Sequence, residues 1–190
     1  MRNRIILGSL AALGLAGPAL AQGGFSYNFV ELGYVNTEID NPDIDGDGFG
    51  LRGSLAVSKN FHVFTEYADQ DFDGNVDGKT FELGGGLNWA LSPNLDLIAT
   101  ISYVRSEVDT PLGDFDDDGY GLGLGLRGRA TDQLELTGGI RYVDLDDSGD
   151  NTSLRVGGRY FFTPQFAVGL DLDYDDDATS WVLGARYTFR

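Results

Sequence analysis

Apolar and polar residues alternate along most of this chain. In the segment 95–104, apolar side chains hold every odd position from Leu95 to Tyr103, whereas Asp96 and Thr100 hold even ones. A period of two residues is typical of a β-strand whose two faces meet different surroundings. The same pattern recurs in ten segments, and we expect a strand in each of 26–38, 48–58, 61–71, 78–91, 95–108, 119–130, 134–146, 151–162, 166–175 and 179–189.

The connectors between these segments differ in length in a regular way. Those at 59–60, 92–94, 131–133 and 163–165 are short, and the others are mostly longer and rich in Asp. Short turns at one end and longer loops at the other are typical of transmembrane β-barrels, in which the short turns face the periplasm. We therefore expect an all-β fold, a transmembrane antiparallel up-and-down β-barrel of about ten strands.

Most charged side chains in the middle of these segments share one parity, and we expect that parity to face the barrel interior. An Arg on the lipid side costs roughly 2–4 kcal/mol at the bilayer midplane, so several of them would outweigh the stability of a whole domain. A soluble barrel is the alternative, and it would place apolar residues inside instead. The expected interior charges are Glu31, Arg52, Glu66, Glu82, Asp96, Arg127, Arg129, Glu135, Arg141, Arg155, Arg159, Asp171, Asp173 and Arg186.

Aromatic residues of the opposite parity gather at both ends of the segments. Such rings of aromatic side chains are typical of the two membrane interfaces, with Leu, Val, Ile and Ala between them. The expected external girdle consists of Tyr34, Phe49, Tyr67, Phe81, Tyr103, Tyr120, Tyr142, Tyr174 and Trp181, and the periplasmic girdle of Phe61, Trp89, Tyr160, Phe162, Phe166, Tyr187 and Phe189.

The first residues have the pattern of a secretory signal peptide. Arg2 and Arg4 give a positive start, an apolar run follows at 5–15, and residues 19–21 form an A-x-A cleavage motif. We expect residues 1–21 to be removed and residues 22–190 to form one outer-membrane barrel domain. The chain has no Cys, so disulfides and thiol chemistry play no part in it.

Both ends of the expected domain give the chain a resemblance to a known family. Tyr187 and Phe189 look like the carboxy-terminal signal that the barrel-assembly machinery reads, although Arg190 follows the final Phe. The stretches 27–34 and 60–64 resemble small OmpA/OmpX-like porin-family barrel proteins of proteobacteria. The resemblance implies location in the bacterial outer membrane and insertion by that machinery.

Acidic residues recur at alternate positions in the expected external loops. The spacing Asp-x-Asp-x-Asp-Gly appears three times and matches the first half of a calcium-binding loop, although no bidentate Glu completes the second half. Alternate Asp residues can equally form turns or continue the polar parity of a strand. If cations bind, we expect Ca²⁺ or Mg²⁺ held weakly, with no other cofactor. The candidate ligands are Asp43, Asp45, Asp47, Asp69, Asp71, Asp73, Asp114, Asp116 and Asp118.

The balanced interior charges leave two functions open. If they interlock, the barrel is a closed membrane anchor that displays its loops, with a structural or surface-interaction role. If they line opposite walls, they leave a narrow, cation-preferring pore. The residues of this candidate lumen network are Glu31, Arg52, Glu66, Glu82, Arg127, Glu135, Arg141, Arg155, Arg159, Asp171 and Arg186.

Charge and composition narrow the function classes. A net charge of −17 disfavours nucleic acid as a partner, because phosphates would be repelled. His62 is the only histidine and falls at the periplasmic end, so it cannot serve a His-based catalytic triad at the external rim, and we expect no enzyme. The expected partners of this monomer are the outer membrane with its lipopolysaccharide, through divalent cations, and cationic peptides or host surfaces.

Overall fold

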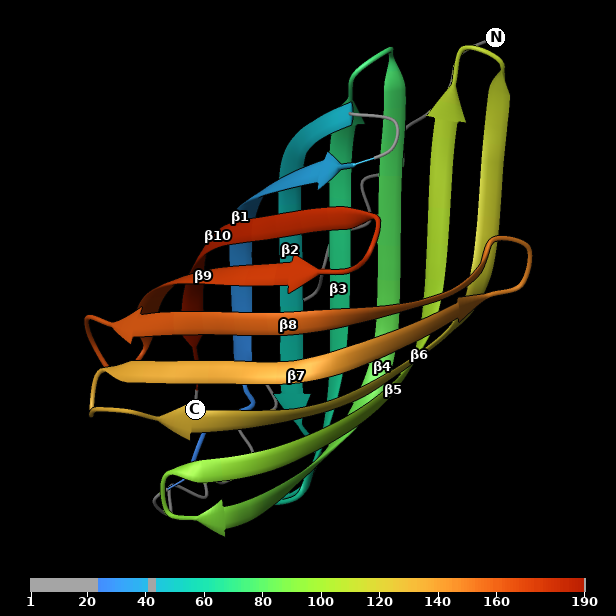
Figure 1. Cartoon of the computed structure of the whole chain (residues 1–190). Coiled ribbons are helices and arrows are strands. Elements are labelled where there is room, and N and C mark those ends of the chain that lie inside the picture. Colours follow the sequence, from blue (N-terminus) through green and yellow to red (C-terminus); the bar gives the residue numbers. More distant parts are fainter. Residues whose placement is uncertain (1–23, 41–43, 190) are drawn as a thin grey trace, which may run out of the picture.

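Figure 1 shows the computed structural model, a closed barrel in which every strand is antiparallel to its neighbours. It describes residues 24–40 and 44–189, so the expected signal peptide at 1–21 lies outside the described residues. The ring follows chain order, and β1 pairs with β10 to close it. This confirms the predicted fold. The strands are β1 (Phe29–Ile39), β2 (Ile44–Ala56), β3 (Phe61–Phe72), β4 (Val76–Ser92), β5 (Leu95–Thr110), β6 (Gly113–Arg129), β7 (Leu134–Leu145), β8 (Gly149–Phe161), β9 (Phe166–Tyr174) and β10 (Ala178–Thr188).

The outside of the barrel is apolar and the inside is charged, as the parity of the strands predicted. Ile101 and Leu32 expose 62% and 59% of their surface on the outside, whereas Glu31 and Arg127 expose only 4% and 5% within the lumen. A water-soluble protein has the reverse distribution. The outer surface therefore suits lipid, and the soluble-barrel alternative is disfavoured. In the described part of the chain, no helix is long and apolar enough to span a bilayer.

Aromatic side chains pack together at both ends of the apolar surface. At the external end the rings of Tyr34 and Trp181 have centroids 5.4 Å apart. At the periplasmic end the rings of Tyr160 and Phe162 lie 5.1 Å apart, edge to face. These contacts fit two interfacial girdles, because amphipathic aromatic rings favour the level of the lipid head groups.

The external connectors differ from the prediction, because the acidic segments extend the strands instead of forming long loops. β6 begins at Gly113, well before the expected residue 119, and β5 continues to Thr110, so that only Pro111 and Leu112 lie between them. The alternation of acidic and other residues continues the strand period into this region. The acids therefore lie on a wall of strands above the girdle.

The tight external turns depend on residues that tolerate a left-handed backbone. Gly74 and Asn75 have φ values of 84° and 62° between β3 and β4, and Gly149 has a φ of 85° at the start of β8. Glycine and asparagine adopt this conformation at the smallest steric cost. Such turns let the strands reverse direction without a long loop.

Candidate functional site

Glu31 is the centre of an ion-pair group inside the barrel. In the strand register it lies directly between Arg52 of β2 and Arg186 of β10. The carboxylate accepts hydrogen bonds from Nε of Arg186 at 2.8 Å and from Nε and Nη2 of Arg159 at 2.8 and 3.1 Å. Nη1 of Arg52 lies 3.5 Å away. One buried carboxylate thus faces three guanidinium groups.

Asp171 on β9 joins the same group. Its carboxylate accepts hydrogen bonds from Nη1 of Arg52 and Nη2 of Arg159, both at 2.5 Å. A Cβ added at Gly157 would collide with the Asp171 carboxylate, and one at Gly169 would collide with the Arg159 side chain. Inward-facing glycines therefore provide the space in which the long Arg side chains meet the acids.

One chain of ion pairs crosses the lumen from wall to wall. Glu66 on β3 lies 3.6 Å from Nε of Arg52 and 3.6 Å from Nη1 of Arg155 on β8. In the closed ring β3 and β8 lie halfway round from each other. Arg155 is also held by Asp173, whose carboxylate accepts from its Nε at 2.5 Å. This bridge obstructs the middle of the barrel.

Glu82 and Arg141 form a second, separate pair. Nη2 of Arg141 on β7 donates to Glu82 on β4 at 2.6 Å, and the hydroxyl of Ser102 donates to the other Glu82 oxygen at 2.6 Å. Each oxygen of the Glu82 carboxylate therefore accepts one hydrogen bond. This pair narrows the lumen at the level of the Glu66 bridge, since Glu66 and Glu82 are register partners.

A third group occupies the periplasmic mouth, where Glu135 binds two guanidinium groups. Its carboxylate accepts from Nε and Nη2 of Arg127 at 3.0 and 2.6 Å and from Nη2 of Arg129 at 3.3 Å. Together these three groups contain all eleven candidate lumen residues, but the structure divides them instead of joining them in one network. Asp173 belongs to the first group, and Asp96 and Arg129 to the mouth.

The segment 24–28 also enters this mouth, although the sequence pattern had assigned its last residues to the first strand. Arg127 donates from Nη1 to the backbone oxygen of Ser26 at 2.9 Å, and Tyr27 donates its hydroxyl to Asp96 at 2.9 Å. The Arg127 guanidinium lies 4.9 Å from the centre of the Phe25 ring. Because β1 begins only at Phe29, the segment is free to fold into the lumen.

Two cavities remain along the barrel axis. The inner chamber, towards the periplasm, has about 260 Å³, and the outer chamber, towards the external end, has about 350 Å³. Six Arg and three acidic side chains line the inner chamber, whereas three Arg and five acidic side chains line the outer one. The residues common to both form the layer between them: Arg52, Glu66, Glu82, Arg141 and Arg155.

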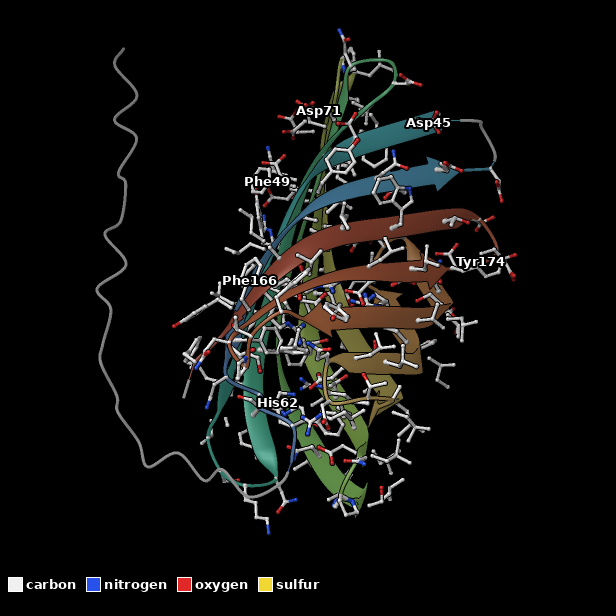
Figure 2. All side chains as sticks on the ribbon, turned by 90° about the vertical axis from the view of Figure 1, so that its left-hand side faces the viewer. Asp45, Phe49, His62, Asp71, Phe166 and Tyr174 are labelled. Carbon is white, nitrogen blue, oxygen red and sulfur yellow. The ribbon has the colours of Figure 1, made fainter. Side chains whose placement is uncertain are left out.

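The candidate metal ligands that belong to strands face the outside of the barrel. Asp45 and Asp71 are at one end, and His62 lies towards the other (Figure 2). Asp43 is outside the described residues, and Asp73 is in a turn. The remaining candidates are spread over three strands, with Asp45 and Asp47 on β2, Asp69 and Asp71 on β3, and Asp114, Asp116 and Asp118 on β6. Within residues 24–40 and 44–189, no three acidic or histidine side chains gather closely enough to hold a metal ion.

A row of five aspartates nevertheless runs across neighbouring strands. Each is the register partner of the next, in the order Asp47, Asp71, Asp77, Asp109 and Asp114. We call these five residues the acidic row. A hydrogen bond with Asp77 raises the pKa of the Asp71 carboxyl, as expected for two acids placed directly opposite.

The acidic row has the outward parity of the girdle, so it does not line the mouth of the lumen. Asp71 follows Tyr67 on β3 by an even number of residues, and Tyr67 donates its hydroxyl to Asp69 at 3.0 Å. The nearby cations are few: Lys79 pairs with Asp109 at 3.3 Å. In a cation-preferring pore, the acids at the external mouth would be other residues, such as Asp173 and Asp175 of the outer chamber.

Several solved structures and one family model are similar to this chain. The chain is similar to the NanC porin (TM-score 0.49, 9% identity, 85% of this chain and 100% of that one) and to the KdgM porin (0.48, 11%, 84% and 99%). It is also similar to the N-terminal barrel domain of Pseudomonas aeruginosa OprF (0.47, 12%, 87% and 100%). No curated protein sequence matches it. Residues 7–189 match the family model described as outer membrane protein beta-barrel domain, so the chain belongs to that family and is a protein of the bacterial outer membrane.

Proposed function

We propose that this protein is a closed, non-enzymatic barrel that strengthens the outer membrane by binding lipopolysaccharide through divalent cations. The observation that carries the proposal is the acidic row, which faces outward just beyond the external aromatic girdle. Acids that bind a soluble partner could face in any direction, whereas all five residues of the acidic row face the lipid side of the barrel.

The height of the acidic row above the girdle matches the lipid head groups. Strands rise about 3.3 Å per residue and tilt by about 40° in such barrels, so Asp69 and Asp71 lie roughly 5 and 10 Å above Tyr67 along the membrane normal. Girdle tyrosines sit at the interface itself. The carboxylates therefore lie beside the phosphates and sugars of the outer leaflet.

Carboxylates and lipid phosphates repel each other unless cations lie between them. At physiological salt this repulsion acts over about 8 Å, so it affects carboxylates that lie directly beside the lipid phosphates. Ca²⁺ and Mg²⁺ prefer oxygen ligands, and both accept a mixture of carboxylate, phosphate and water. In this arrangement the lipid supplies the ligands that the protein lacks, so no closed site within the chain is needed.

Replacing the acidic row with Asn tests this proposal. In vesicles that contain lipopolysaccharide, 1 mM Ca²⁺ should raise the melting temperature of the unmodified barrel, and EDTA should reverse the rise. The variant Asp47→Asn, Asp71→Asn, Asp77→Asn, Asp109→Asn and Asp114→Asn should lose the response. In vesicles of phosphatidylcholine alone neither protein should respond.

The matched control replaces acids that lie outside the row. Asp132, in a periplasmic turn, and Asp175, which lines the outer chamber, are suitable. The variant Asp132→Asn, Asp175→Asn should keep the full calcium response. An equal response of the row variant, or a response without lipopolysaccharide, would contradict the proposal.

A narrow cation-preferring pore is the second candidate, and the two chambers favour it. They lie on either side of a single ion-pair layer, so rearrangement of that layer would connect them. The outer chamber has more acids than Arg, which would attract cations. The cross-lumen bridge between Glu66 and Arg155 supports the closed state instead.

Three further expectations belong to this proposal. The barrel acts as a monomer, since β1 and β10 pair with each other and leave no open sheet edge in the ring. The assembly machinery recognises the last strand through Tyr187 and Phe189. Cationic peptides compete with divalent cations for the external acids, because both are attracted by the same negative field.

A further inference from the structure

The inner chamber contains two buried polar groups without a partner. Ser54 exposes 4% of its surface and His62 6%. Neither Oγ of Ser54 nor Nδ1 of His62 has a hydrogen-bond partner among residues 24–40 and 44–189, and both side chains line the chamber. Both atoms have less than 1 Å² of accessible surface, so they lie within the packed wall and do not face the open space of the chamber. Native proteins rarely leave buried polar groups unsatisfied, so this part of the wall is unusual.

These polar groups are set in an aromatic wall. Ser54 on β2 lies in register between Phe29 on β1 and Phe64 on β3. His62 lies one inward position further along β3, and Tyr27 stacks on its imidazole with ring centroids 4.5 Å apart. The wall therefore offers mainly apolar surface, and a small-molecule site needs a few well-placed polar groups besides.

Arg186 adds a cationic edge beside this wall. Its Nε donates to Glu31, whereas Nη1 and Nη2 have no acceptor within the described part of the chain. The guanidinium lies 3.6 Å from the centre of the Phe29 ring, and Phe29 is the register partner of Ser54. Two terminal guanidinium nitrogens match the two oxygens of a carboxylate in plane and spacing.

The charge and size of the inner chamber agree with an anionic organic molecule. Six Arg side chains line it against the acids Glu66, Glu82 and Asp171. The space of about 260 Å³ far exceeds the 10–15 Å³ that one water needs. The chamber is also lined by Gly123, Gly125 and Gly139, which have no side chains to fill its space.

We propose that the inner chamber is a binding site for a small organic carboxylate. The carboxylate lies against Nη1 and Nη2 of Arg186. The apolar part of the molecule packs against Phe29 and Phe64 and reaches His62. The site is distinct from the acidic row and does not depend on the role proposed for that row.

The single histidine gives a direct measurement of binding. The mature chain, residues 22–190, is refolded in detergent with benzoate present, so that entry through the mouth does not limit binding. His62 then contributes the one imidazole signal in the nuclear magnetic resonance spectrum. Benzoate should shift this signal with saturation, and benzyl alcohol, which has the same ring without the charge, should not.

Two variants and a matched control locate the site. Arg186→Lys keeps the charge but offers a single ammonium nitrogen in place of the paired guanidinium nitrogens, so it should weaken benzoate binding about tenfold. Arg186→Gln should abolish it, whereas Arg129→Gln should leave it unchanged, because Arg129 binds Glu135 at the mouth and does not line the chamber.

Three results would overturn the proposal: no saturable shift, an equal shift with benzyl alcohol, or unchanged affinity in Arg186→Lys. Each would mean that water alone fills the chamber. If Arg186→Gln does not refold, the Arg186→Lys result decides, since that variant keeps a positive charge beside Glu31.

Discussion

Replacing Glu31 with Gln is expected to destabilise the barrel by about 3–5 kcal/mol, the range for breaking a buried ion pair by removing one partner. Gln keeps only one acceptor oxygen and turns an NH2 group towards the guanidinium donors, and Arg186 remains buried without a counter-charge. Arg159 would still form its ion pair with Asp171, so the destabilisation would come mainly from the unpaired charge of Arg186. Reversible urea unfolding in detergent micelles or lipid vesicles, followed by tryptophan fluorescence, measures the change.

Glu38 provides the control for this prediction. It lies on β1 as well, but its side chain is exposed at the external end. Glu38→Gln should change the free energy of unfolding by no more than about 0.5 kcal/mol. If both variants unfold at the same urea concentration, the group around Glu31 does not stabilise the fold.

Replacing Leu124 with Arg is expected to destabilise the membrane-inserted barrel by about 2–4 kcal/mol, the cost of a lipid-facing Arg near the midplane. Leu124 exposes 51% of its surface on the outside and lies two outward positions from Tyr120 of the external girdle. Its register partners Ala99 and Ile140 are apolar. Unfolding in lipid vesicles measures the effect.

The same substitution at Leu112 is the matched control. Leu112 lies in the external turn between β5 and β6 and is 97% exposed. Leu112→Arg should be nearly neutral, because its side chain is in water. Equal effects at both positions would mean that the surface around Leu124 does not contact lipid.

Parity in the sequence was sufficient to predict the faces of the strands. Glu31, Arg52 and Arg186 were expected inside because a charge on the lipid side is costly, and the register places them side by side. Local alternation determines which face a residue occupies, so this part of the fold could be derived without a structure.

Contacts across the lumen could not be predicted in the same way. Glu66 and Arg155 meet from opposite walls, and alternation along either strand gives no information on such a pairing. It depends on the stagger of the closed ring and on the reach of each side chain. The division of the lumen charges into three groups follows from this geometry.

The external acids and the segment 24–28 show where local patterns were misassigned. Asp114, Asp116 and Asp118 share the parity of Tyr120, which was a signal for continued strand, but turn-forming residues nearby favoured a loop before residue 119. Tyr27 shares the inward parity of Glu31, so its place in the lumen could have been inferred. That the segment leaves the sheet before Phe29 could not, because it depends on contacts with Arg127 and Asp96.

Single-channel conductance in a planar bilayer tests most directly whether the lumen is closed. The refolded mature protein, with insertion verified independently by protease protection, should give no discrete steps. The variant Glu66→Ala, Arg155→Ala, which removes the bridge between β3 and β8, should give openings at the same protein density. Discrete cation-selective steps from the unmodified protein would contradict the closed barrel and identify a narrow pore.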